Sequence, residues 1–195
     1  MNGVAGSCLV IPFRLTGVCN VKWQANVVLI LLFIVTPIAS AQTSTEARGQ
    51  AQETQARGYW IDPATNLMWA GKDNGKDVIW RQANKYCRNL RLGGYSDWRL
   101  ATIEELEGIY DKSANAPGLG GKHNDEPYTR HVKGNLFLTG HPWSGSKLLD
   151  DRGHATGGVW YFYFEDGYKG KGDGTWSGRG EDHNMRALCV RPSGQ

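Results

Sequence analysis

The sequence predicts an α+β domain, with a short hairpin, two helices, long loops and then antiparallel strands. Three observations support this fold class. Short strand-like runs occur near residues 59–70 and 159–190, and apolar residues recur at helical spacing between residues 80 and 109. Polar stretches rich in glycine separate these segments.

The first segment has the features of a signal peptide. Residues 27–35 form an unbroken apolar run, Lys22 precedes the run, and the small residues Ala39-Ser40-Ala41 follow it. This pattern predicts a signal peptide over residues 1–41, cleaved between Ala41 and Gln42. The alternative is a membrane anchor. A span needs about 20 apolar residues, however, and this run is too short and is followed by Pro37. We therefore expect an exported protein (periplasmic, cell-surface or secreted) with no membrane span after cleavage.

Cleavage would leave 154 of the 195 residues, which is ordinary for one domain. It would remove two of the 22 Lys and Arg residues and none of the 19 Asp and Glu residues, so the net charge would be about +1. A nearly neutral chain gives no reason to expect a nucleic-acid partner. Residues 42–58 are rich in Gln, Thr, Ala, Glu and Arg without apolar periodicity, which predicts a flexible linker before a domain at residues 59–192.

Two cysteines remain after cleavage, Cys87 and Cys189. In an oxidising compartment two cysteines normally pair. The bond would close a loop of roughly 100 residues, which contributes on the order of 4–5 kcal/mol in the chain-entropy model. A reactive thiol or a metal pair is the competing interpretation, but the sequence has no CxxC and no His at ligand spacing. We expect a structural disulfide.

The first elements of the domain are a hairpin and a helix. Strand-like runs at residues 59–62 and 67–70 flank turn residues at 63–66. Asp77 is placed to cap a helix. The helix would bury the apolar positions Trp80, Ala83, Cys87 and Leu90.

A second helix follows a glycine break and a short extended piece at residues 97–100. Thr102 and Glu105 have the spacing of a capping box. The helix would turn Ile103, Leu106 and Ile109 inward. Residues 111–135 are rich in Gly, Asn, Pro and Lys, and they predict a long loop.

The last third predicts β-structure. Residues 159–164 are aromatic on both faces, which is typical of a central strand. Asp166-Gly167 would form a turn, and residues 168–180 would form a flexible polar loop. Residues 185–190 alternate as a final strand. One face of that strand would carry Met185, Ala187 and Cys189.

Several segments resemble one known family, the Lcl C-terminal domain family. The most specific is Leu92-Gly93-Gly94-Tyr95-Ser96-Asp97-Trp98-Arg99-Leu100-Ala101-Thr102. The others are Leu67-Met68-Trp69, Trp80 with Ala83 and Tyr86-Cys87, Trp143-Ser144, Trp160-Tyr161-Phe162 and Arg186-Ala187-Leu188-Cys189-Val190-Arg191. The resemblance covers Tyr59 to Pro192. The sequence departs from the family pattern at Ala101, where Pro is usual, and at His141-Pro142 before Trp143.

The resemblance implies a fold similar to C-type lectins and to formylglycine-generating enzymes. It also implies exported bacterial proteins, some of them adhesins that recognise host glycans. Fold alone does not carry function, so each candidate site needs its own argument.

Two candidate sites are better explained structurally. Asp97-Trp98-Arg99 could supply a base and an anion clamp, but we expect Trp98 to pack in the core and the two charged residues to satisfy loop backbone or each other. The five histidines fall in expected loops without metal-site spacing: His123, His131, His141, His154 and His183.

We expect no metal and no cofactor. The acidic pairs Asp150-Asp151 and Glu181-Asp182 could offer hard oxygen ligands to calcium. C-type lectins that bind sugar through calcium use Glu-Pro-Asn and Trp-Asn-Asp patterns. This sequence has Glu126-Pro127-Tyr128 and lacks the second pattern, so calcium-dependent sugar binding is disfavoured.

The candidate ligand site is the glycine-rich stretch after residue 167, where aromatic and cationic residues occur together. Its residues are Tyr168, Lys169, Lys171, Trp176 and Arg179. A ring can stack on a sugar and the cations can pair with anionic groups. The alternative is a solvated loop with one ring against the domain.

These observations predict a non-enzymatic binding module that holds a glycan or protein ligand through its C-terminal loops. The alternatives are a relative of the formylglycine-generating enzymes and a purely structural envelope protein. The enzyme needs reactive cysteines, whereas the two cysteines here are expected to be bonded to each other.

Overall fold

The computed structural model describes residues 48–49, 51–120, 126–175 and 184–194. The chain divides into two compact units, Met1–Thr43 and Ser44–Gln195, and all described residues belong to the second. The expected signal peptide therefore lies outside the described residues. Among those that are described, no helix combines the length and the apolar character needed to cross a membrane.

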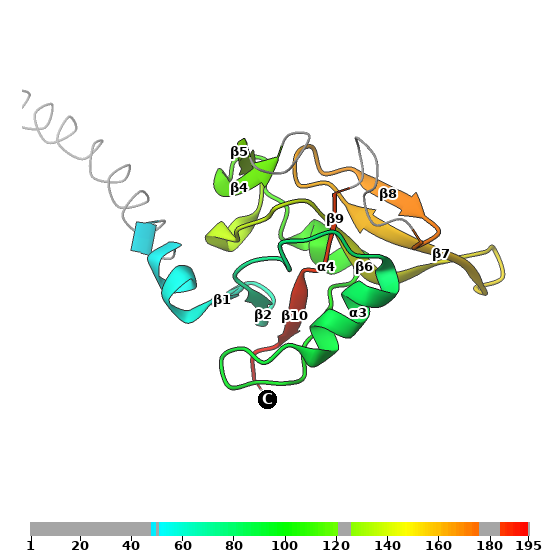
Figure 1. Cartoon of the computed structure of the whole chain (residues 1–195), viewed down its shortest axis with the longest axis horizontal. Coiled ribbons are helices and arrows are strands. Elements are labelled where there is room, and N and C mark those ends of the chain that lie inside the picture. Colours follow the sequence, from blue (N-terminus) through cyan, green and yellow to red (C-terminus); the bar gives the residue numbers. More distant parts are fainter. Residues whose placement is uncertain (1–47, 50, 121–125, 176–183, 195) are drawn as a thin grey trace, which may run out of the picture. The chain divides into compact units, whose positions relative to one another are not determined.

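One sheet joins the start of the domain to its end (Figure 1). Its four strands run in the order β1-β2-β10-β3, with the bounds Tyr59–Ile61, Leu67–Ala70, Cys189–Pro192 and Arg99–Leu100. All neighbours are antiparallel, and β1 and β2 form the expected hairpin. Asp62 closes the turn by accepting hydrogen bonds from Ala64 N at 3.1 Å and Thr65 Oγ1 at 2.6 Å.

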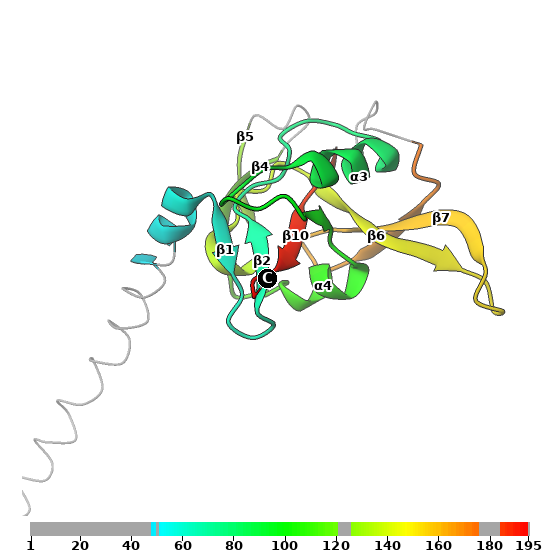
Figure 2. The same cartoon turned by 90° about the horizontal axis from the view of Figure 1, so that it is seen from below.

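A second sheet contains the aromatic strand expected from the sequence. Its order is β8-β7-β6-β9, with the bounds Lys169–Gly172, Ala155–Phe162, His141–Leu149 and Met185–Arg186. The β6–β7 hairpin projects away from the rest of the described domain in both views (Figures 1 and 2). In this sheet β6 and β9 pair in parallel, and the other two pairs of neighbours are antiparallel.

The expected long loop at residues 111–135 is partly wrong, because it contains a hairpin of two further strands, β4 (Ala116–Gly120) and β5 (Glu126–Arg130), and a short 3-10 helix, η1 (Lys133–Asn135). The glycines made this segment resemble a loop. Gly118 is required by close packing, since a Cβ there would lie 2.4 Å from the carbonyl oxygen of Leu138.

The two helices form where the apolar spacing predicts them. Helix α3 spans Trp80–Asn89 and helix α4 spans Ile103–Gly108. The capping box of α4 is present: Thr102 Oγ1 accepts a hydrogen bond from Glu105 N at 3.2 Å, and Thr102 N donates to Glu105 Oε2 at 2.8 Å. The predicted cap of α3 was wrong, since Ile79 is its N-cap and Asp77 pairs with Arg186.

The C-terminal segment separates two apolar clusters of the core. Met185, Ala187 and Cys189 belong to one cluster, as expected for one face of the segment, whereas Leu188 and Val190 belong to the other. The predicted single strand at residues 185–190 is nevertheless two strands in different sheets, β9 and β10. The predicted disulfide is present and joins Cys87 of α3 to Cys189 of β10.

The described domain is thus mixed α and β, with few helices, several small sheets and one disulfide. Residues 51–57, within the expected linker, are helical. Ala, Gln, Glu and Arg favour helix. Thr54 is buried and donates a hydrogen bond from Oγ1 to the Gly134 carbonyl at 3.1 Å, which ties this helix to the domain.

Candidate functional site

The predicted ligand site is only partly described. Tyr168, Lys169 and Lys171 lie at and in the edge strand β8, whereas Trp176 and Arg179 lie outside the described residues. The expected flexible loop is therefore wrong for residues 169–172, which form a strand paired with β7.

Strand pairing places the described site residues on opposite faces of the sheet. Lys169 pairs with Phe162 and Lys171 with Trp160, while Tyr163 N donates to the Tyr168 carbonyl at 2.9 Å. Successive side chains of a strand point to opposite faces, and paired residues share a face. Tyr168 therefore shares a face with Tyr163, and the two lysines share the other face. The structure does not bring all of the predicted residues together.

On the lysine face, both cations have partners within the domain. Lys169 Nζ lies 3.0 Å from Glu107 Oε2 of α4, and Lys171 Nζ lies 4.8 Å from the centroid of the Trp160 ring. Exposed ion pairs and cation–π contacts each contribute at most about 1 kcal/mol. These contacts help to hold β8 against the rest of the domain. A ligand would have to compete with Glu107 and Trp160 for the two lysines.

On the tyrosine face, an aromatic row extends from the surface into the domain. We define the row as Tyr168, Tyr163 and His141. Tyr168 is 61% exposed, and its ring centroid lies 5.8 Å from that of Tyr163. Tyr163 in turn lies 4.1 Å from the His141 ring. The outer ring is presented to solvent on a packed support, which limits the side-chain entropy that it would lose on binding.

Gly170 is the reason that the aromatic side chains can lie over the edge strand. A Cβ at this position would lie 2.1 Å from ring atoms of Tyr161. Tyr161 is 8% exposed and its ring centroid is 5.5 Å from that of Tyr163. Gly170 therefore makes room for the Tyr161 ring on this face of β8.

A charged pair lies at the inner end of the aromatic row. Glu165 forms an ion pair with Arg130 of β5, and its Oε2 lies 3.5 Å from His141 Nδ1. Burial lowers the pKa of the Arg130 guanidinium, which is 2% exposed. Arginine nevertheless stays charged in proteins, so the Glu165 carboxylate neutralises a buried cation. This contact connects the β4–β5 hairpin to the sheet that carries Tyr168.

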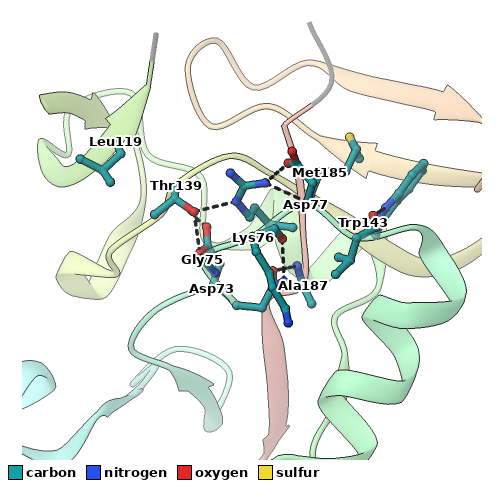
Figure 3. A network of polar contacts seen from close by, with 12 residues as sticks. Asp73, Gly75, Lys76, Asp77, Leu119, Thr139, Trp143, Met185 and Ala187 are labelled. Carbon is teal, nitrogen blue, oxygen red and sulfur yellow. Dashed lines mark hydrogen bonds and ion pairs between the residues drawn. The ribbon is translucent and has the colours of Figure 1, made fainter. Parts of the chain in front are cut away.

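A polar network holds the loop before α3 against β9 (Figure 3). The buried Asp73 accepts hydrogen bonds from Thr139 N at 2.6 Å and Thr139 Oγ1 at 2.9 Å. Thr139 Oγ1 accepts from Arg186 Nε at 2.7 Å, and Arg186 pairs with Asp77. Burial raises the pKa of Asp73 above its ordinary value, against the effect of these hydrogen bonds. Because every member has a partner, the network is structural and also positions His141, two residues after Thr139.

The segment Asp97-Trp98-Arg99 is also structural. Trp98 is 2% exposed, as expected. Of the two alternatives expected for the charged residues, the pairing of Asp97 with Arg99 is wrong, because Asp97 Oδ1 accepts a hydrogen bond from Arg191 Nε at 2.6 Å and Arg99 pairs with Glu105. The backbone alternative is confirmed for Arg99, whose Nη1 donates to the Leu100 carbonyl at 3.2 Å. The guanidinium of Arg191 lies 3.7 Å from the Tyr95 ring centroid.

The described ranges contain no group of three or more His, Cys, Asp or Glu residues arranged to hold a metal ion. His141 is not in a loop as expected but begins β6. Asp150, one of the predicted acidic candidates, accepts hydrogen bonds from the backbone of Arg152 and His154 in a tight turn. The pair Glu181-Asp182 lies outside the described residues.

The sequence analysis did not identify the residues that lie behind Tyr168, namely Tyr163, His141, Glu165 and Arg130. Tyr163 was detectable, because it is the last tyrosine of the aromatic run of residues 159–164 and lies just before the Asp166-Gly167 turn. The other three come from β5, β6 and the turn after β7, and no local spacing connects them.

These features define a small α+β domain that is closed by one disulfide and presents a supported aromatic ring at an edge strand. The family model described as the Lcl C-terminal domain matches residues 58–191. This is more than half of the chain, so the protein belongs to the Lcl C-terminal domain family. No curated protein matches the chain at a significant level.

Proposed function

We propose that this protein is an exported, non-enzymatic binding module that holds a glycan against Tyr168, in the manner of an adhesin. The observation that carries the proposal is the 61% exposed Tyr168 ring, which rests on Tyr163 and through it on His141. An exposed aromatic ring on a rigid support is suited to stack on the apolar face of a sugar.

The charged pair at the inner end of the aromatic row adds little to such a site, because the facing atoms His141 Nδ1 and Glu165 Oε2 are buried. Stacking on one ring therefore supports weak binding, of the order of 1 mM or about −4 kcal/mol for one sugar. Several copies on a surface would raise the overall affinity through multivalency.

Membership in the family supports the finer fold assignment, a C-type-lectin-like domain. In related lectin-like folds the loops of the C-terminal half form the binding face, and Tyr168 lies in that half. The Cys87–Cys189 disulfide supports export, because disulfides persist in the periplasm, at the cell surface and outside the cell.

The alternative is an enzyme of the formylglycine-generating type, whose chemistry needs accessible cysteines. Cys87 and Cys189 are both fully buried and bonded to each other, which favours a binding module over this chemistry. The purely structural envelope protein remains as the third class, and it predicts no ligand at Tyr168.

A glycan array probed with the purified protein tests the proposal. We expect binding to a subset of glycans, a loss of at least tenfold in Tyr168→Ala, and retention in Tyr168→Phe, which keeps the ring. Leu149→Ala is the matched control, since Leu149 is also 61% exposed but lies in the β6–β7 hairpin. Equal binding by Tyr168→Ala and the unmodified protein would show that Tyr168 is not the site.

A further inference from the structure

A second surface, formed by α3 and the loop before it, carries a concentrated positive charge. Residues 72–91 contain six cations and two carboxylates, a net charge of +4, while the whole chain has +3. The six cations are all exposed: Lys72, Lys76, Arg81, Lys85, Arg88 and Arg91. The carboxylates do not balance them, because Asp73 is buried against Thr139 and Asp77 pairs with Arg186.

A cleft of about 550 Å³ between the loop and α3 is lined by three of these cations, Lys76, Lys85 and Arg91. Asp77 also lines the cleft, with its carboxylate paired to Arg186. The half-buried Tyr86 and Leu90 supply the apolar part of its lining. The cleft is separate from the aromatic row at Tyr168, with which it shares no residue.

The cations of this cleft are available to a ligand. In the described part of the chain, Lys76 and Lys85 form no ion pair, and Arg91 uses only one guanidinium nitrogen, on the carbonyls of Arg88 and Leu90. The Gln82 side chain also lines the cleft and accepts a hydrogen bond from Ile79 N through Oε1, which leaves its NH₂ group as a donor.

Both walls of the cleft are held in place by contacts with the C-terminal segment, residues 185–190. On the loop side, Asn74 donates to the Lys76 carbonyl at 2.7 Å and accepts from Ala187 N at 2.7 Å. On the helix side, the disulfide fixes Cys87 to Cys189. A ligand would therefore meet cations on a backbone that is already ordered, which reduces the entropy cost of binding.

We propose that this cleft binds a phosphate monoester group, whether carried by a sugar, by a lipid headgroup or as free phosphate. A phosphate monoester has a charge of about −1.5 to −2 at pH 7 and three strong acceptor oxygens. Three unpaired cations and an amide donor match both the charge and the acceptors. A sulfate ester carries only one negative charge, so it would gain less from the same cations.

The first test is a titration of the purified protein with inorganic phosphate at constant ionic strength, followed by the NMR shifts of backbone amides. We expect the largest shifts at residues 76–91 and at least a tenfold loss of affinity in the double variant Lys85→Gln/Arg91→Gln. The control Lys112→Gln/Arg152→Gln removes the same charge from exposed positions outside the cleft and should change affinity less than twofold. Shifts spread evenly over the surface, or an equal loss in both variants, would overturn the proposal.

The second test separates the possible carriers of the phosphate. Glucose 6-phosphate and vesicles containing phosphatidic acid both present a phosphate monoester, and tighter binding of either one than of free phosphate would support the site and identify the carrier. Glucose 6-sulfate should bind at least fivefold more weakly than glucose 6-phosphate. Equal affinity for the sulfate and phosphate esters would contradict the assignment to phosphate. Thermal melting of each variant confirms that the change acts on binding rather than on folding.

Discussion

Cys87 of α3 is bonded to Cys189, the first residue of β10, across a separation of 102 residues in the sequence. Cys189 pairs with Leu100 of β3, and β10 also pairs with β2. The bond thus connects the first long helix to a strand in the middle of the sheet that joins both ends of the domain.

Removing this bond should strongly destabilise the domain. For Cys87→Ser we expect a loss of about 2–5 kcal/mol, and thus a fall of about 5–20 °C in melting temperature, because the unfolded chain regains loop entropy. Differential scanning calorimetry measures the change, and a limited proteolysis assay should show faster digestion. Two free thiols from Cys87 and Cys189 in the native protein would contradict the structure and favour the enzyme alternative.

The ion pair of Asp97 with Arg191 predicts a pH dependence of stability. The hydrogen bond from Arg191 holds the pKa of Asp97 below its ordinary value. A depressed carboxyl pKa stabilises the folded state above the unfolded pKa of about 3.9, and this stabilisation is lost as the pH falls through the folded pKa.

Asp97→Asn should therefore be less stable than the unmodified protein at pH 7, and the difference should shrink progressively below about pH 4. Urea denaturation at a series of pH values measures the difference. Asp151→Asn, an exposed change in the β6–β7 turn, serves as the control. A difference that stays constant from pH 7 to pH 2 would show that Asp97 acts without its charge.

Gly170 should be sensitive to the smallest enlargement. Gly170→Ala places a Cβ against the Tyr161 ring, so we expect a loss of about 1–3 kcal/mol through overpacking and a displaced Tyr161. The control is Gly108→Ala in α4, where a Cβ meets nothing within 4 Å and alanine favours helix, so stability should rise slightly. Equal melting temperatures for the two variants would contradict the packing of Tyr161 over β8.

The two faces of β8 should contribute differently to glycan binding. Lys169→Ala/Lys171→Ala removes cations that already contact Glu107 and Trp160, so we expect at most a twofold change in affinity for a neutral glycan. Tyr168→Ala should lose at least tenfold. Calorimetric titration with a glycan selected from the array measures both, and the opposite order of effects would place the site on the lysine face.

Folding should not depend on a metal ion. The disulfide offers a covalent closure, and we expect a chelator to shift the melting temperature by less than about 1 °C. A ligand that binds only the native state stabilises it by about 2.7 kcal/mol at a hundredfold excess over its dissociation constant. A larger fall with chelator that calcium restores would reveal a metal site, and Asp150-Asp151 and Glu181-Asp182 would then be the first pairs to mutate.

The elements that the sequence predicted well depend on local interactions. The Thr102–Glu105 capping box links residues three positions apart and forms as expected, and the turn at Asp62 closes through Ala64 and Thr65. The apolar spacing of α3 placed Ala83 and Cys87 on its buried face. In each case the residues that decide the structure lie only a few positions apart, so the local sequence pattern is enough to predict it.

The predictions that failed depend on distant partners. Asp77 could cap α3 by its position, but Arg186 holds it from 109 residues away. The glycine-rich segment after residue 115 became the β4–β5 hairpin, packed closely against the Leu138 carbonyl. The amino-acid composition of a segment gives no information about such contacts with distant residues.

The sequence by itself determined the α+β class, the pairing of Cys87 with Cys189 and the family, because element order, cysteine count and the motif around residues 92–102 can be read directly along the chain. Only the tertiary structure decided the two surfaces proposed to bind ligands. The register of β8 on β7 separates Tyr168 from the lysines beside it in the sequence, and the packing of the loop before α3 gathers Lys76, Lys85 and Arg91 around one cleft. Side-chain direction and the spacing of charges are set by contacts between segments that lie far apart in the sequence.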